Sequence, residues 1–147
     1  MVHTWEKILI GSTASLSKIF SEKDVILFAD LSGDKNPLHI DEVFSQENRF
    51  GKRIVHGAFT TGLISAVLGT SLPGPGTIYL RQTFTFLRPV FIGDECVAHV
   101  EVMDKCTKPK SVVLKAWCVN QNGDCVLEGQ VEVVPPKEQY SAYPQTA

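Results

Sequence analysis

The sequence predicts an α+β domain in which one buried helix is followed by a set of antiparallel strands. Residues 57–68 are apolar on nearly every side, which is typical of a helix enclosed by other elements. Strand-like segments follow over residues 77–89, 94–103 and 111–134, and the last contains Asn122-Gly123, a strong hairpin signal. A segregated helix and sequential hairpins favour a sheet of four strands wrapped around that helix.

A first helix is predicted over residues 22–32, ahead of the buried one. Ser21 and Asp24 have the spacing of a capping box, and Gly33 suits the left-handed residue that ends a helix. The residue that follows Gly33 therefore begins a loop directly beyond a helix C-terminus.

A second, short helix is predicted over residues 42–48, with Asp41 as its cap. In the loop before it, Asn36 precedes Pro37 and is pushed toward extended backbone. The buried helix should then run for about 18 Å at the usual rise per residue and end at Gly69.

The composition is that of one soluble domain. The chain has 147 residues, of which 44% are hydrophobic, a formal net charge of −2 and a pI near 6.1. It has no stripe of Lys or Arg, which argues against a nucleic-acid partner or an anionic membrane. Its most apolar stretch, residues 58–68, is too short and too interrupted by Thr and Ser to span a bilayer. We expect a single domain over residues 1–147, with a core over 12–134 and a polar tail over 135–147.

The N-terminal sequence lacks a basic segment followed by a long apolar run, so it does not predict a secretory signal. Four cysteines are present without a CxxC pair, so neither a zinc site nor a disulfide framework is favoured. Buried thiols in a reducing compartment are the expectation. We therefore expect a cytoplasmic protein, with the mitochondrial matrix as the alternative.

The segment SGDKNPLHID, residues 32–41, combines an acid, an amide, a proline and an imidazole. Asp34 and His39 lie five residues apart, on either side of Asn36-Pro37. Proteins tune carboxylates and imidazoles toward neutral pKa values, so such a pair is suited to moving protons. A polar loop residue at Asp34 and a packing histidine at His39 are the structural alternatives.

Three stretches in a fixed order match one known family. GDKNPLH resembles the catalytic loop of the MaoC-like (R)-specific enoyl-CoA hydratases, IVHG the start of their central helix, and PGPGTIYLRQTFTFLRPVFIGD their later strands. The resemblance covers residues 25–134, most of the chain. It implies a hot-dog fold, with an antiparallel β-sheet around a long buried helix, and hydro-lyase activity on trans-2-enoyl thioesters.

The resemblance also implies roles for three side chains. Asp34 and His39 would be the catalytic pair that activates a water for (R)-specific, syn addition, and which of them protonates C2 stays open. Ser65 would hydrogen-bond the catalytic aspartate and fix its orientation. A hydroxyl bonded to the carbonyl of Thr61 on the same helix is the alternative for Ser65.

Gly57 is expected to act in both catalysis and substrate binding. Backbone N–H groups at a helix N-terminus suit the negative charge that builds on a thioester oxygen, and a residue without a side chain lets that oxygen approach. A simple turn into the helix is the alternative. Asn36 and His56 complete the predicted substrate-binding set, and for His56 holding the turn or lining the site is preferred to a role as second base.

No cofactor and no metal are expected, because PGPG has neither the spacing nor the Lys-Ser of a phosphate loop. The expected partners are an acyl thioester of coenzyme A or acyl carrier protein, and a second copy of the chain, since hot-dog proteins usually dimerise through sheet edges. Arg81, Arg88 and Lys108 are candidates for the phosphates of coenzyme A, although solvated strand ends are the simpler explanation.

Other functions remain open at this point. The same pair would dehydrate 3-hydroxyacyl thioesters, including those of acyl carrier protein, because a catalyst lowers one shared barrier. A hot-dog thioesterase has the same fold and would release free thiol. A non-catalytic acyl-thioester binder would leave the ultraviolet absorption of an enoyl thioester unchanged.

Overall fold

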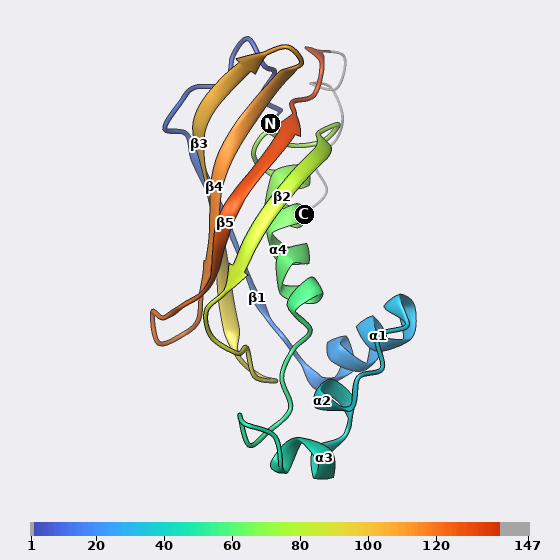
Figure 1. Ribbon diagram of the computed structural model, residues 1–147. Coiled ribbons are helices and arrows are strands. Elements are labelled where there is room, and N and C mark those ends of the chain that lie inside the picture. The colour runs from blue at the N-terminus through green and yellow to red at the C-terminus, as the bar shows by residue number, and fades with distance from the viewer. Residues whose placement is uncertain (1, 139–147) are drawn as a thin grey trace.

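Five strands and four helices make up residues 2–138, the part of the chain that the computed structural model describes (Figure 1). In chain order they are β1 (Thr13–Ile19), α1 (Glu22–Ser32), α2 (Pro37–Ile40), α3 (Glu42–Gln46), α4 (Gly57–Thr70), β2 (Ile78–Phe86), β3 (Glu95–Thr107), β4 (Lys110–Val119) and β5 (Cys125–Val134). The predicted α+β class is confirmed.

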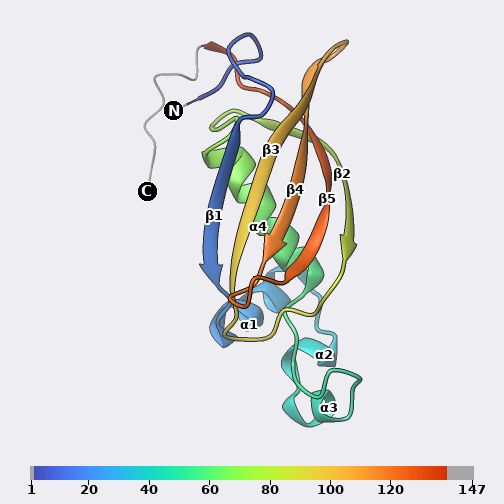
Figure 2. The same ribbon diagram turned by 90° about the vertical axis from the view of Figure 1, so that its left-hand side faces the viewer.

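The strands form one antiparallel sheet in the order β1-β3-β4-β5-β2, so β1 and β2 are its edges (Figure 2). The hairpin between β4 and β5 turns where Asn122-Gly123 predicted it, and Gly123 has the left-handed φ of 80° that such a turn requires. Strand β1 was not predicted, because this short edge strand is largely exposed and its sequence TASLSKI lacks dense apolar alternation.

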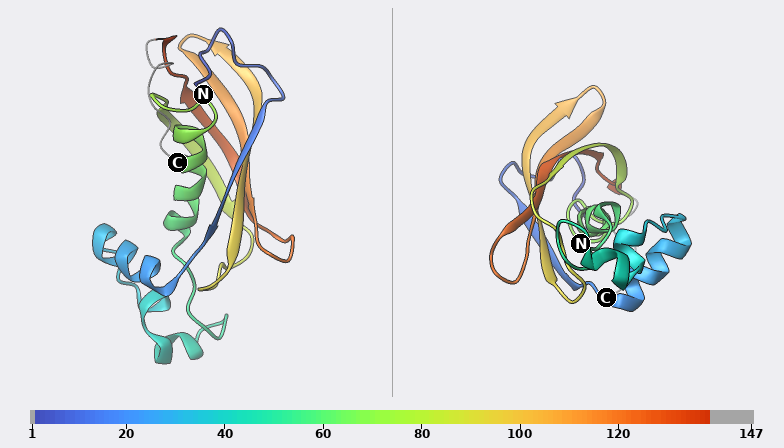
Figure 3. Two further views of the ribbon diagram at one scale, coloured as in Figure 1. Left: turned by 180° about the vertical axis from the view of Figure 1, so that it is seen from behind. Right: turned by 60° about the horizontal axis from the view of Figure 1, so that its bottom comes forward.

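Helix α4 lies along the concave face of the sheet, which curves around it (Figure 3). Its sheet-facing side chains Leu63, Ile64, Val67 and Leu68 are all buried. They meet alternate residues of the central strands, because successive side chains of a strand point to opposite faces. On β3 these inward residues are Cys96, Ala98, Val100 and Val102. This arrangement is the one expected for a hot-dog domain.

The sheet covers one side of α4 and leaves the other side open. Ala58, Gly62 and Ser65 are exposed on that open side, so within a single chain α4 is buried on its sheet-facing side only. The prediction that Gly69 ends the helix is wrong, since α4 continues to Thr70 and Gly69 has no left-handed φ. The apolar composition of α4 therefore exceeds what the sheet alone buries.

Helix α1 begins and ends as predicted. The Ser21 hydroxyl accepts a hydrogen bond from the Asp24 N–H at 3.1 Å, and the Asp24 carboxylate accepts one from the Ser21 N–H at 3.3 Å. Gly33 has a φ of 81°, and its N–H donates to the carbonyl of Ala29 at 3.0 Å. The loop with the candidate acid and imidazole therefore starts from a rigid helix end.

Helices α1, α2 and α3 lie together at the end of the sheet where α4 begins (Figures 1 and 3). Asp41 caps α3 as predicted, although α3 ends at Gln46 rather than at residue 48. The four-residue helix α2 was not predicted, because it is too short to show a periodic pattern. It carries His39 and thus sets the direction of the imidazole.

None of the four cysteines forms a disulfide within residues 2–138, and Cys96 and Cys118 are buried as expected. Burial raises the pKa of the Cys118 thiol to about 12, so this thiol stays protonated. Over the same residues, no helix is long and apolar enough to cross a membrane. Of the predicted polar tail, residues 139–147 lie outside the described residues, while Pro135 and Pro136 are buried.

Candidate active site

The loop after α1 is held by a relay of short side-chain to backbone hydrogen bonds. The Ser32 hydroxyl accepts from the Asp34 N–H at 3.1 Å, and the Asp34 carboxylate accepts from the Asn36 N–H at 3.2 Å. The side-chain amide oxygen of Asn36 then accepts from the Leu38 N–H at 3.1 Å and caps α2. Each step spans two residues, so the sequence itself bends the chain here.

His39 lies in α2, and its imidazole is fixed by a backbone carbonyl. Nδ1 lies 2.7 Å from the carbonyl oxygen of Ile54, which can only accept a hydrogen bond. Nδ1 therefore carries the proton, and Nε2 of the neutral ring has a free lone pair. This tautomer makes Nε2 of His39 a proton acceptor.

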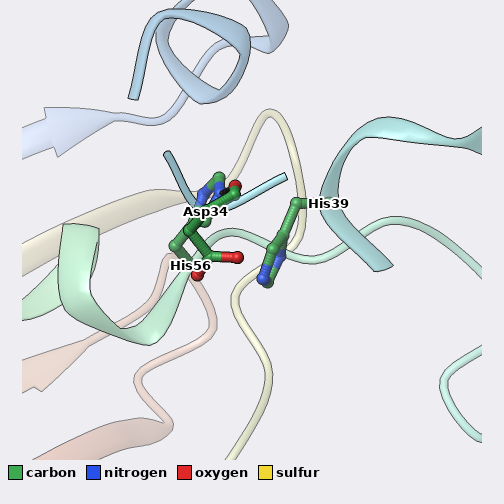
Figure 4. Close-up of side chains that lie close together, drawn as sticks. All are labelled: Asp34, His39 and His56. Atoms are coloured by element: carbon green, nitrogen blue, oxygen red, sulfur yellow. Dashed lines mark hydrogen bonds between the residues drawn. The ribbon is translucent and has the colours of Figure 1, made fainter. Parts of the chain in front are cut away.

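Three titratable side chains converge at this point (Figure 4). One side-chain oxygen or ring nitrogen from each of Asp34, His39 and His56 lies within 4.8 Å of the others. Asp34 is exposed, whereas His39 and His56 are 7% and 1% exposed. The Asp34 carboxylate is therefore open to a ligand, whereas the two imidazoles of the trio are buried.

The trio is also the one cluster in residues 2–138 whose donor types could hold a metal ion. Two of its ring nitrogens already lie at hydrogen-bond distance from the Ile54 and Asp34 carbonyls. An acid–base site uses the remaining donors without a metal.

His56 is the residue before α4, and its ring contacts both other members of the trio. Nε2 lies 2.9 Å from the backbone carbonyl oxygen of Asp34, and the ring stacks on that of His39 with centroids 3.8 Å apart. Burial lowers the pKa of His56, and the nearby His39 lowers it further. Holding the turn, as preferred from the sequence, agrees with these contacts.

Arg53 braces the same loop from its other side, and sequence reasoning missed it. Its side chain is 7% exposed, its Nε donates to the His39 carbonyl at 2.7 Å, and its guanidinium donates to the Glu22 carboxylate at 2.7 Å. One cation therefore ties α2 to the first turn of α1. Arg53 lies four residues before the predicted helix, within KRIVHG. A single buried Arg gives no periodic signal in the sequence, so only the fold reveals its contacts.

Gly57 is the first residue of α4 and lines a cavity of about 320 Å³, whose lining includes Val55 and Gly57 on either side of His56 but no member of the trio itself. No side chain caps this helix end, and within residues 2–138 the Gly57 N–H has no hydrogen-bond acceptor. A Cβ at this position would lie 2.9 Å from the ring of Phe86, on β2. The helix therefore begins with a free N–H at its positive end, and the missing side chain of Gly57 makes room for the Phe86 ring.

The cavity has an apolar wall and a basic rim. Ile54, Val55, Phe86 and Leu127 contribute to the wall, and Arg49 and Arg88 also line it. Neither of these two Arg residues takes part in an ion pair within the described part of the chain. The cavity is therefore suited to an apolar ligand with an anionic end.

Ser65 lies two turns beyond Gly57, on the open side of α4. Over residues 2–138, its hydroxyl makes no hydrogen bond to Asp34 or to the carbonyl of Thr61. Its predicted role stays a prediction.

Comparison with known proteins agrees with the site. Residues 9–121 match the family model described as a MaoC like domain. An (R)-specific enoyl-CoA hydratase of Rhodospirillum rubrum is 45% identical over 136 residues, which cover 92% of this chain and 94% of the relative. A 3-hydroxybutyryl-CoA dehydratase of Methylorubrum extorquens is 43% identical, with 92% and 85% covered. An R-hydratase structure from Pseudomonas aeruginosa superposes with a TM-score of 0.86 at 40% identity, with 92% and 86% covered.

Fold and site together define a hot-dog domain that carries a carboxylate and an imidazole at the start of its central helix. The chain belongs to the MaoC-like family, and the match covers most of its length. The family resemblance read from GDKNPLH and IVHG is therefore confirmed.

Proposed function

We propose that the protein catalyses the reversible, (R)-specific hydration of trans-2-enoyl-CoA to (R)-3-hydroxyacyl-CoA. The observation that carries this proposal is the meeting of the Asp34 carboxylate and the His39 imidazole, with Nδ1 of His39 bonded to a carbonyl, beside the cavity at the start of α4. The relatives named as enoyl-CoA hydratase and 3-hydroxybutyryl-CoA dehydratase support the same chemistry in its two directions.

The reacting water is held between Asp34 and His39. Two hydrogen bonds of about 2.8 Å let one water bridge atoms separated by less than about 5 Å, and the groups of this trio lie within 4.8 Å of one another. Nε2 of His39 takes one proton of the water as its oxygen bonds to C3. The Asp34 carboxylate accepts a hydrogen bond from the other proton and orients the water.

The electron pair of the double bond moves toward the thioester carbonyl as the C3–O bond forms. The resulting negative oxygen is stabilised by the free N–H of Gly57 at the N-terminus of α4. The His39 imidazolium then gives its proton to C2, and both groups return to their starting state. One water is added on one face, so the addition is syn and no other reactant is consumed.

The remaining predicted contacts support substrate placement rather than proton transfer. Ser65 is proposed to orient Asp34 when substrate is bound, and Asn36 to shape the loop that faces it. Coenzyme A is favoured as the carrier over acyl carrier protein because the relatives reported above are named for coenzyme A thioesters. The cytoplasmic location stays a prediction, with the mitochondrial matrix as its alternative.

We further propose a homodimer joined at β2. This edge strand exposes apolar side chains that a partner would cover: Ile78 is 58% exposed, Leu80 47% and Phe86 54%. The open side of α4 lies next to the same edge and carries small residues, which permit close approach of a second chain. Pairing of the β2 edges of two chains would cover both the exposed apolar side chains of β2 and the open side of α4.

The decisive experiment follows the ultraviolet absorption of crotonyl-CoA with purified protein. Hydration predicts a loss of the enoyl absorption without release of free thiol, and a product oxidised by an R-specific but not by an S-specific 3-hydroxyacyl dehydrogenase. Release of thiol would identify a thioesterase instead. Binding without any change in absorption would identify a non-catalytic binder.

A further inference from the structure

We infer that His56 is a positioning residue that fixes Asp34 and His39 relative to each other. The inference rests on the proposed hydratase function. His56 stands outside the pair that handles the protons, yet its ring contacts both members (Figure 4).

The contact with Asp34 is a hydrogen bond to its backbone. Nε2 of His56 lies 2.9 Å from the Asp34 carbonyl oxygen, so Nε2 carries the proton and donates it. Asp34 is exposed and lies in a loop whose other hydrogen bonds are all local: its carboxylate accepts from the Asn36 N–H, and its own N–H donates to the Ser32 hydroxyl. The bond from His56 anchors this loop to the start of α4, the element that supplies the Gly57 N–H.

The contact with His39 is made through the ring face. The two imidazoles stack with centroids 3.8 Å apart at an interplanar angle of 28°. The Ile54 carbonyl fixes one edge of the His39 ring, and the His56 ring blocks one face. Together these two contacts fix the direction in which Nε2 of His39 points.

His56 is too enclosed to act on substrate directly. The residue is 1% exposed, and Phe28 covers it with a ring centroid 4.8 Å away. Phe28 in turn stacks on Phe59 of α4 at 4.9 Å. The imidazole is therefore held in one rotamer by packing, which is what a group that positions others requires.

The ring must also remain neutral for this role. With Nε2–H given to the Asp34 carbonyl, Nδ1 is left buried without a partner in residues 2–138, so a proton there would have no acceptor. Burial opposes protonation of His56 and is the largest of the effects on its pKa. The nearby His39 also opposes protonation and Asp34 favours it, so the pKa of His56 is lowered. A neutral His56 leaves the positive charge of the proton-transfer step on His39 alone.

Two variants separate the hydrogen bond from the stacked ring. His56→Gln keeps an N–H donor near the position of Nε2 but has no ring, whereas His56→Phe keeps a ring but has no donor. His99→Gln is the matched control, because His99 also stacks on an aromatic ring, that of Trp117 at 5.1 Å, but on β3. All three are assayed as the full chain with crotonyl-CoA, with thermal melting as a check on folding.

A positioning role predicts that His56→Phe lowers kcat by roughly 10²-fold while KM changes by less than about 3-fold. His56→Gln should recover most of this loss, and His99→Gln should match the wild type. Equal losses in His56→Phe and His56→Gln would overturn the role of the donor, and an unchanged kcat in His56→Phe would overturn the inference as a whole.

Imidazole nitrogen NMR tests the ring independently of activity. Between about pH 5.5 and pH 8, His56 should keep one protonated nitrogen and show no titration, while an exposed imidazole titrates in this range. A His56 signal that titrates there would contradict the inference. A wild-type chain without hydratase activity would overturn the proposed function instead, and the NMR result would still decide the state of His56.

Discussion

The carbonyl oxygen of Ile54 accepts a hydrogen bond from the Nδ1–H of His39, with 2.7 Å between the nitrogen and the oxygen, across 15 residues of chain. This bond selects the tautomer in which Nε2 is the proton acceptor. The Ile54 N–H donates to the Leu38 carbonyl at 3.2 Å, so the backbone of residue 54 holds α2 at two points. A backbone partner cannot be removed by mutation of a side chain, which makes this part of the site robust.

Replacement of either member of the pair should abolish most activity and leave the fold intact. Asp34→Asn and His39→Gln should each lower kcat by roughly 10²- to 10⁴-fold, because each removes a group that handles the water proton. Circular dichroism and thermal melting should match the wild type for Asp34→Asn, whose side chain is exposed. Asp104→Asn, at the far end of β3, is the control and should be fully active. Near-normal rates in both site variants would rule out the proposed mechanism.

Gly57→Ala should impair both stability and turnover. The added Cβ would come within 2.9 Å of the far end of the Phe86 ring; because Phe86 is 54% exposed and can turn aside, the loss should stay near the lower end of the about 1–3 kcal/mol typical of overpacking. In a Phe86→Leu background the clash is relieved, so the melting temperature should recover. Turnover should stay roughly 10²-fold below that of the wild type, because the methyl group displaces the thioester oxygen. Recovery of both quantities together would mean that Gly57 serves packing alone.

Arg88→Gln should weaken binding of coenzyme A thioesters without slowing the chemical step. Arg88 lines the cavity with Arg49 and has no ion-pair partner in residues 2–138, so it is available to a phosphate. We expect KM for crotonyl-CoA to rise several-fold at low salt and less at high salt, because screening weakens exposed charge pairs. KM for crotonyl-pantetheine, which lacks those phosphates, should not change. Arg81→Gln, whose cation pairs with Glu132 on β5, is the control. An equal rise for both substrates would exclude phosphate recognition by Arg88.

Leu80→Lys should convert the proposed dimer into a monomer. Leu80 is 47% exposed on the edge strand β2, and a Lys on an edge disfavours pairing with another chain. Light scattering after gel filtration should report half the wild-type mass. Leu16→Lys is the control, because Leu16 is 38% exposed on the opposite edge, β1, and should leave the dimer intact. A wild-type chain that is already monomeric would contradict the dimer proposal.

The sequence by itself predicted the local structure around the site. The capping box at Ser21, the left-handed Gly33 and the cap at Asp41 depend on residues within a few positions of each other, so local pattern suffices for them. The motif GDKNPLH likewise identified Asp34 and His39 as a pair. Which side of α4 the sheet covers could not be predicted, since apolar composition does not say what covers a helix.

Only the tertiary structure decided how the site is held. The Ile54 carbonyl, the Arg53 guanidinium and the His56 ring all reach the loop from 14 to 22 residues away in the chain. No periodicity or spacing encodes such contacts, because they exist only once the sheet has brought the start of α4 against α1 and α2. The sequence therefore determined which groups can move protons, and the fold determined the tautomer, direction and neighbours that let them do so.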